Sequence, residues 1–102
     1  MVLNDEIKNL AEEAPFVPIS TVSSRGEQHL IVVGEVKEIN DDVLTFGIYK
    51  MENTQENLND NGDMQVVLAS TKDEPKGYRL IGTAHAEDDK VLFKAEQAES
   101  LL

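Results

Sequence analysis

The residues best suited to binding chemistry lie between two apolar segments, in the run Met51-Glu52-Asn53-Thr54-Gln55-Glu56-Asn57-Leu58. Their pattern predicts a helix of roughly residues 53 to 60 that begins where a strand ends. The first turn of a helix carries unpaired backbone N–H groups and the positive end of the helix dipole, so Asn53 and Thr54 could help hold an anion such as phosphate. Capping alone is the alternative, because Asn53 as N-cap would pair with Glu56 in a capping box.

The other polar constellations favour turns over metal or catalytic sites. The run Asn57-x-Asn59-x-Asn61-Gly62 resembles the start of a calcium-binding loop, but the decisive twelfth position holds Leu68 instead of glutamate. His29 and His85 are far apart and have no second ligand nearby, so we expect no metal site. The sequence contains no Gly-x-Ser-x-Gly motif, and we assign no catalytic residue.

Composition limits the classes of protein to which the chain could belong. Its 102 residues are enough for one domain, spanning residues 1–102, and a 40% hydrophobic share is normal for a globular protein. The net charge of −11 disfavours nucleic acid as a partner. The absence of cysteine fits a reducing cytoplasm, and no apolar run approaches the roughly 20 residues of a membrane span. We therefore expect a cytoplasmic protein with neither membrane nor nucleic acid as a partner.

The hydrophobic pattern predicts a mainly β protein with flanking helices. Apolar residues at three- and four-residue steps predict an amphipathic helix that Pro15 ends, and Pro18 suggests that the strand after it lies at an edge or begins irregularly. The expected strands cover residues 16–22, 29–39, 43–49, 64–69 and 78–86, and the second and third form a hairpin in the middle of the sheet. From Asp88 onward, the spacing of apolar residues predicts a final helix.

Four short motifs, taken in order, carry a resemblance to a known family. They are Gly26-Glu27-Gln28-His29-Leu30, Val33-Gly34-Glu35-Val36-Lys37, the run 51–58, and Gly77-Tyr78-Arg79-Leu80-Ile81-Gly82-Thr83-Ala84. The chain resembles the FMN-binding split-barrel proteins of the pyridoxamine 5′-phosphate oxidase-like superfamily, above all its short bacterial and archaeal members. The resemblance implies a split β-barrel of about six antiparallel strands with one short helix at the cofactor site. The last strand of longer members is absent, so we expect the final helix or a partner chain to close the barrel.

In that family the helix start reads Lys-Thr-x-x-Asn-Leu, and the lysine and threonine contact the phosphate of FMN. Thr54, Asn57 and Leu58 match this motif, whereas Asn53 stands where the cation is expected. The resemblance therefore implies Thr54 as a phosphate ligand and Asn53 as a weaker, uncharged one. Lys50 is the local cation that could compensate.

The family also lays the flavin ring along paired central strands at a dimer interface. By position, this implicates two groups of residues, namely Val32, Val33 and Gly34 on one strand and Gly47, Ile48 and Met51 near the end of the next. Apolar residues in strands usually only pack, and strand core is the alternative for these positions. Gly47 is the more informative one, because glycine inside a strand often marks the close approach of a ligand or another backbone.

The resemblance implies a homodimeric FMN-binding flavoprotein that acts in electron or hydride transfer, as a redox carrier or a small oxidoreductase. The alternative is a split-barrel module without tight flavin binding, which serves as an assembly or ligand-binding unit. Asn53 and the acidic composition support that alternative. A deazaflavin or haem in the same groove is a further option, and the sequence identifies neither substrate nor redox partner.

Overall fold

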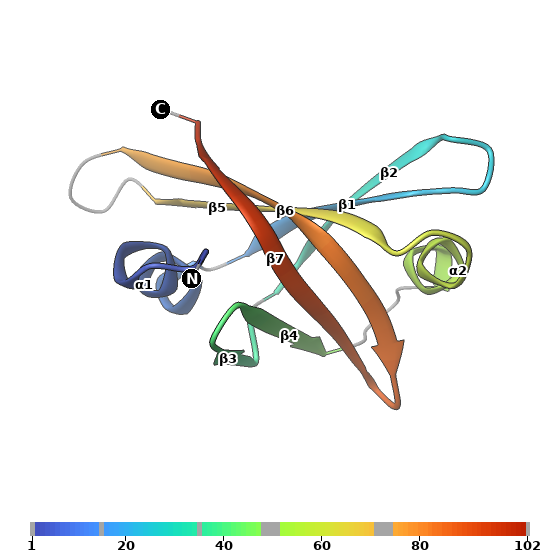
Figure 1. Ribbon diagram of the computed structural model, residues 1–102, viewed down its shortest axis with the longest axis horizontal. Coiled ribbons are helices and arrows are strands. Elements are labelled where there is room, and N and C mark those ends of the chain that lie inside the picture. Colours follow the sequence, from blue (N-terminus) through green and yellow to red (C-terminus); the bar gives the residue numbers. More distant parts are fainter. Residues whose placement is uncertain (1, 15, 35, 48–51, 71–74, 102) are drawn as a thin grey trace.

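The chain folds into one antiparallel sheet with two short helices (Figure 1). A computed structural model describes residues 2–14, 16–34, 36–47, 52–70 and 75–101, although at 52, 53 and 60 it describes the backbone only. The elements in chain order are α1 (Asp5–Glu13), β1 (Val17–Val22), β2 (Gln28–Val33), β3 (Glu38–Asn40), β4 (Val43–Gly47), α2 (Glu52–Asp60), β5 (Asp63–Ser70), β6 (Lys76–Glu87) and β7 (Lys90–Ser100). The order in the sheet is β2-β1-β5-β6-β7-β4-β3, with every pair antiparallel.

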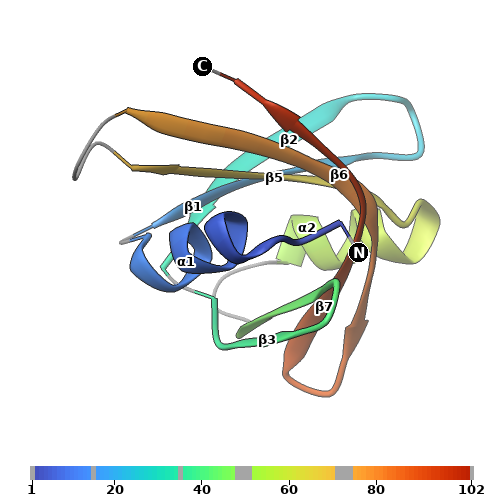
Figure 2. The same cartoon turned by 60° about the vertical axis from the view of Figure 1, so that its left-hand side comes forward.

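The sheet curls around a core made by alternate residues of its strands. Strong twist in β6 and β7 carries the sheet around, so that its two halves enclose that core (Figures 1 and 2). The largest fully buried side chains are Phe46, Phe93, Leu3, Ile7, Ile19, Leu44, Met64, Leu68, Leu80, Val17, Val66 and Val91. The two helices lie at opposite ends of the molecule, α1 packed against β5 and α2 against β1 and β6. This architecture confirms the predicted split barrel with flanking helices.

A β-bulge in the longest hairpin requires a glycine. Ile81 pairs with Gln97 and Gly82 pairs with Ala95, so Glu96 is an extra residue in β7. A Cβ atom on Gly82 would lie 1.9 Å from the carbonyl oxygen of Lys94, far inside contact distance. Such bulges increase the local twist, which helps to bend the sheet into a barrel.

Helix α1 is stabilised by its own sequence. Ile7, Leu10 and Ala11 are buried on one side of it. The Asn4 side-chain oxygen accepts a hydrogen bond of 2.9 Å from the backbone N–H of Ile7, which is the N-cap arrangement. At the other end, the Ala14 backbone N–H donates to the carbonyl of Leu10.

Two carboxylates tie α1 and the residues before it to the sheet. Glu6 accepts a hydrogen bond of 2.6 Å from the Tyr78 hydroxyl and forms an ion pair of 3.0 Å with Lys76. These two partners, Tyr78 first, lower the pKa of Glu6, and Glu6 in turn raises the pKa of Tyr78. Asp42 accepts hydrogen bonds from the backbone N–H groups of Val2 and Leu3, and the bond from Leu3 is the main reason its pKa is lowered.

The predicted final helix is wrong, because this segment forms β7. A two-residue turn at Asp88-Asp89 joins β7 to β6, with Asp88 in the left-handed region at φ 56°. Val91, Phe93 and Ala95 are buried in alternation, which is the period of a strand. Because the last segment itself joins the sheet, no C-terminal helix closes the barrel within the described residues.

The predicted central hairpin is also wrong in part. The segment 29–39 is not one strand, since β2 ends at Val33 and β3 begins at Glu38. The turn at 40–42 does form a hairpin, between β3 and β4, but β2 and β3 are the two ends of the sheet and β6 is its middle strand. Strand β1 is internal, and its pairing with β5 starts only at Ile19, so Pro18 stays outside that ladder.

Candidate functional site

The first turn of α2 contains a buried hydroxyl for which the described residues provide no hydrogen-bond partner. The helix begins at Glu52, which places Asn53 and Thr54 inside the first turn and contradicts the alternative of Asn53 as N-cap. Thr54 is 0% exposed, and its Oγ1 atom has no hydrogen-bond partner in the part of the chain that the structure describes. An unpaired buried hydroxyl costs about 1–3 kcal/mol, which makes it an uncommon feature of a folded protein.

Asn57, the other buried polar residue of α2 in the part that the structure describes, does have a hydrogen-bond partner. Asn57 is 7% exposed and donates a hydrogen bond of 3.0 Å from Nδ2 to the Thr21 hydroxyl on β1. Thr21 lies on the inner face of β1, in alternation with Val17 and Ile19, and is itself completely buried. This bond, one helical turn after Thr54, attaches α2 to β1.

A polar groove of about 280 Å³ separates the turn between β1 and β2 from the exposed side of α2. Its lining includes the carboxylates of Glu27 and Glu56, together with Ser23, Gln28, His29 and Asn57. Two carboxylates make this groove unsuitable for an anion. A phosphate would therefore approach α2 from its N-terminal end, where the backbone N–H groups of the first turn point.

The residues predicted to meet a flavin ring lie in different surroundings. Val33 is buried in the core, Val32 is 60% exposed on the outer face of β2, and Gly34 follows the end of that strand. A Cβ atom on Gly34 would have open space around it, whereas one on Gly47 would lie 3.1 Å from Cε of Lys37. The described group nearest to that Cβ position at Gly47 is the side chain of Lys37, and the predicted contact of Gly47 with a ligand stays a prediction.

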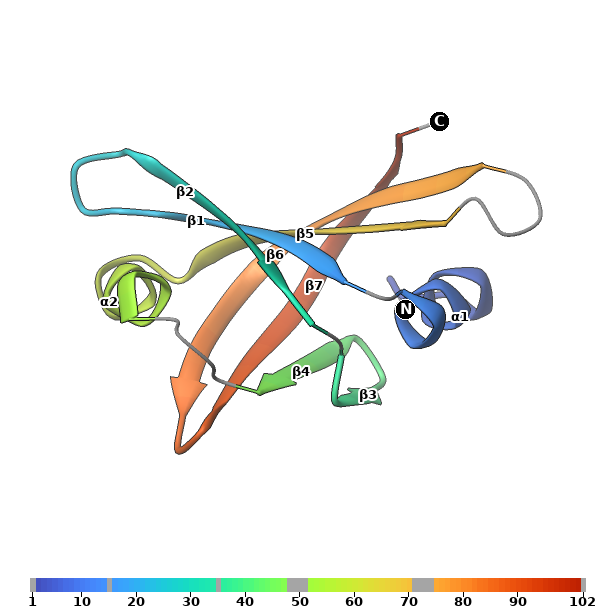
Figure 3. The ribbon, with the colours of Figure 1, turned by 180° about the vertical axis from the view of Figure 1, so that it is seen from behind.

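The two predicted ring segments are not paired strands. Strand β2 pairs with β1, while β4 pairs with β3 and β7. Lys37, before β3, donates a backbone hydrogen bond of 2.7 Å to the carbonyl of Thr45 on β4. Strand β2 and the hairpin of β3 and β4 follow each other in the chain but lie at the two ends of the sheet (Figure 3).

Three of the predicted binding residues, Ile48, Lys50 and Met51, lie outside the described residues, as does the side chain of Asn53. Their proposed roles stay predictions. The sequence analysis did not predict that two residues, Thr21 and Lys37, contact this region. Thr21 could have been found from its inward alternation with Val17 and Ile19, whereas no local pattern marks Lys37, which meets Gly47 ten positions away in the chain.

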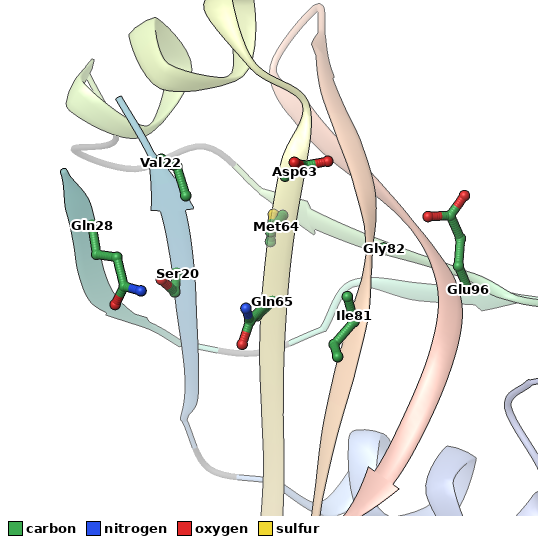
Figure 4. Close-up of a pocket in the computed structure, with 9 residues that line it drawn as sticks. All are labelled: Ser20, Val22, Gln28, Asp63, Met64, Gln65, Ile81, Gly82 and Glu96. Carbon is green, nitrogen blue, oxygen red and sulfur yellow. The ribbon is translucent and has the colours of Figure 1, made fainter. Parts of the chain in front are cut away.

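The outer face of the sheet carries a row of uncharged side chains that crosses five strands. In register they are Leu30, Ser20, Gln65, Ile81 and Gln97. A groove of about 260 Å³ lies over the middle of this row at Ser20, Gln65 and Ile81, and the carboxylates of Asp63 and Glu96 also line it (Figure 4). Leu30 is 70% exposed, and Val32 on the same strand is 60% exposed.

The described residues form neither a metal-binding cluster nor a membrane-spanning helix. Among residues 2–14, 16–34, 36–47, 52–70 and 75–101, no three His, Cys, Asp or Glu side chains are grouped so that they could hold a metal ion. Within the same ranges, no helix combines the length and the apolar character that a membrane-spanning helix needs.

Comparison with known proteins gives similarity in structure only. No family model and no curated protein matches the sequence. A protein of the pyridoxine phosphate oxidase family from Clostridium acetobutylicum superimposes with a TM-score of 0.75 at 16% identity, over 93% of this chain and 84% of that one. The chain has the split-barrel fold of pyridoxamine 5′-phosphate oxidase-like proteins.

Two further similar structures differ in ligand, since one is an FMN-binding protein and the other a heme storage protein. An FMN-binding protein from Syntrophomonas wolfei matches with a TM-score of 0.71 at 17% identity, covering 93% of this chain and 88% of that one. The heme storage protein HutZ from Vibrio cholerae matches with a TM-score of 0.71 at 17% identity, covering 98% and 95%. These matches confirm the predicted resemblance in fold, and at such identities they say nothing of the cofactor of this chain.

Proposed function

We propose that this protein binds FMN and acts in electron or hydride transfer, as a redox carrier or a small oxidoreductase. The observation that carries the proposal is the buried hydroxyl of Thr54, which has no hydrogen-bond partner among the described residues and lies in the first turn of a nine-residue helix. The backbone N–H groups of that turn and the Thr54 hydroxyl together form a donor set suited to a phosphate. The bound flavin would supply the redox chemistry, and the protein would supply phosphate anchoring and the surroundings of the ring.

The residues at the site fit a phosphorylated cofactor in kind. A phosphate oxygen would accept a hydrogen bond from Thr54 and so remove the cost of the unpaired hydroxyl. Asn53, in the same turn, would add an uncharged contact in place of the cation that the family resemblance implies, with Lys50 as a local cation. The ring would then lie toward the ends of β2 and β4, near Val32, Val33, Gly34, Gly47, Ile48 and Met51.

We propose that the working form is a homodimer that uses the outer face of the sheet. Two chains of net charge −11 repel each other except where they can meet through uncharged surface. The row from Leu30 to Gln97 offers such a surface, with Val32 as a second exposed apolar residue on the same strand as Leu30. A cytoplasmic location, inferred from the lack of cysteine, belongs to the same proposal.

An absorbance spectrum from about 300 to 600 nm tests the cofactor, recorded on the protein as purified and again after FMN is added and excess is removed by gel filtration. Retained flavin bands at about one per chain are the expected result. A colourless protein that retains nothing would overturn the proposal and favour the module without tight flavin binding. The same experiment with haem, giving a stable Soret band where FMN gives none, would replace the flavin by haem.

The variant Asn53→Lys tests whether the phosphate lies at α2. Restoring a cation in the first turn should tighten FMN binding, up to about tenfold for a charge-assisted bond of roughly 1.4 kcal/mol. Asn59→Lys adds the same charge to an exposed position of the same helix and is the matched control. Equal affinities in Asn53→Lys, Asn59→Lys and the unaltered protein would mean that residue 53 does not meet the phosphate.

A further inference from the structure

Two lysines lie beside Gly47, the last residue of β4, one by side-chain contact and one by strand register. The space where Gly47 lacks a side chain is taken by Lys37, whose Cε and Cγ atoms lie 3.1 and 3.8 Å from the position of a Cβ atom there. The hydrogen bond from the Lys37 backbone to Thr45 holds the base of this side chain against β4. The stem of Lys37 therefore lies over Gly47 on the outer face of the sheet.

The second lysine comes from β7. Lys90 is the direct cross-strand partner of Gly47, so its side chain leaves the sheet on the same face, and cross-strand Cβ positions lie about 5 Å apart. On β6, the cross-strand partner of Lys90 is Glu87. The Oε2 atom of Glu87 lies 3.3 Å from Nε2 of His85. Two of the nine Lys and Arg residues of a strongly acidic chain are thus directed to one glycine.

We propose that Lys37 and Lys90 form a cationic clamp for the polar edge of the flavin ring and raise the affinity of the site for reduced over oxidised flavin. This inference rests on the proposed function and extends it to Lys37 and Lys90, which the sequence analysis did not name as binding residues. The clamp supplies the positive charge that is missing at Asn53, but at the opposite end of the cofactor. Reduction adds negative charge to the ring, so neighbouring ammonium groups stabilise the reduced form more than the oxidised one.

The assignment to the ring and not the phosphate follows from position. Gly47 ends β4, and four residues of chain separate it from Glu52, where α2 and the proposed phosphate donors begin. The end of β4 and helix α2 lie apart in Figures 1 and 3, so the two lysines and Thr54 occupy separate places on the molecule. A long, flexible lysine stem also yields to a ligand without disturbing the backbone.

Binding of FMN and of riboflavin, which lacks the phosphate, separates the two ends. We would titrate both ligands into the unaltered protein and into Lys37→Met, Lys90→Met and Lys94→Met. Lys94 lies on the same face of β7 as Lys90 but opposite Val43 and Thr83, and it serves as the control. Lys37→Met and Lys90→Met should each weaken FMN and riboflavin by the same factor, about three- to tenfold. Both should also shift the midpoint potential of bound FMN to more negative values, and Lys94→Met should change neither.

Gly47→Ala gives an independent variant. Its Cβ atom would press on Lys37 from 3.1 Å, and since a lysine stem can move, the variant should fold and displace that side chain. We expect Gly47→Ala to reproduce the effect of Lys37→Met and to add little to it in the double variant.

Each outcome has one meaning. Loss of FMN affinity without loss of riboflavin affinity would place the lysines at the phosphate and overturn the clamp. Unchanged affinities and potential in Lys37→Met and Lys90→Met, with flavin still bound, would overturn the clamp alone. A protein that binds neither FMN nor riboflavin would overturn the clamp and the proposed function together.

Discussion

The two helices have the same length, nine residues each, but they differ in whether the polar groups of the first turn have hydrogen-bond partners among the described residues. In α1, the Asn4 side chain caps the first turn, and Glu6 is bonded to Tyr78 and Lys76 on β6. In α2, Asn57 donates a hydrogen bond to Thr21, while the buried Thr54 hydroxyl has no partner within the part of the chain that the structure describes. The comparison shows that the first turn of α1 is capped by its own chain, whereas a buried hydroxyl in the first turn of α2 has no partner among the described residues.

The largest expected effect of a single substitution is at Thr54. Thr54→Val keeps the shape of the side chain and removes the hydroxyl, so FMN affinity should fall about tenfold to a hundredfold, the worth of a hydrogen bond to a charged group. Stability of the unliganded protein should stay the same or rise, because an unpaired buried hydroxyl is removed. Calorimetric titration and urea unfolding measure the two quantities. A clear loss of stability in Thr54→Val would show that the hydroxyl has a structural partner.

Asn57→Leu should have the next largest effect, and on stability first. It removes the hydrogen bond to Thr21 and leaves that hydroxyl buried and unpaired, at a cost of about 1–3 kcal/mol in the free energy of unfolding. The double variant with Thr21→Val restores an apolar match and should regain part of the loss. Chemical denaturation of the three variants checks this, and full additivity of the two single substitutions would contradict the contact.

The variant Asn4→Ala tests the N-cap of α1. Loss of the N-cap of α1 should lower the free energy of unfolding by about 1 kcal/mol. The affinity for FMN should not change, because α1 packs on β5 at the other end of the molecule. Asn4→Asp, which keeps a capping oxygen, is the matched control. A change of FMN affinity in Asn4→Ala would mean that the two ends are coupled.

The smallest expected effect is a dependence of stability on acid pH. The pKa of Asp42 is held below its ordinary value of 3.8 by the N–H groups of Leu3 and Val2, so its contribution is present above that value and is lost as pH falls through the lowered pKa. Glu6, whose ordinary pKa is 4.5, follows the same sign. Thermal unfolding between about pH 6 and 2.5 should show a shallower decline for Asp42→Asn than for the unaltered protein. Parallel curves would exclude Asp42 as a contributor.

Local patterns predicted more of the fold than of the site. The spacing of Ile7, Leu10 and Ala11 gave α1, and the first turn of α2 was placed to within one residue. The last segment was misread because its apolar residues fit a helical spacing as well as the alternation of Val91 and Phe93, and only pairing with β6 and β4 decides between them.

Long-range pairing explains what the sequence could not show of the site. Thr54 was predicted from its place in a helix start, which is local. Lys37 was not, because its contact with Gly47 depends on where the chain runs after β2 ends, and its relation to Lys90 depends on the register of β4 and β7. The order of the strands, with β2 and β3 at the two ends, is likewise set by pairing between segments far apart in the chain.

Backbone amide NMR during titration with FMN tests the central claim most directly, since it reads both helices in one spectrum. The account predicts large shifts for the N–H groups in the first turn of α2, among them that of Thr54, and none for the first turn of α1, where Asn4 already caps Ile7. Saturation should occur at about one FMN per chain. Shifts of equal size in both helices, or none in α2 while flavin binds, would contradict the account.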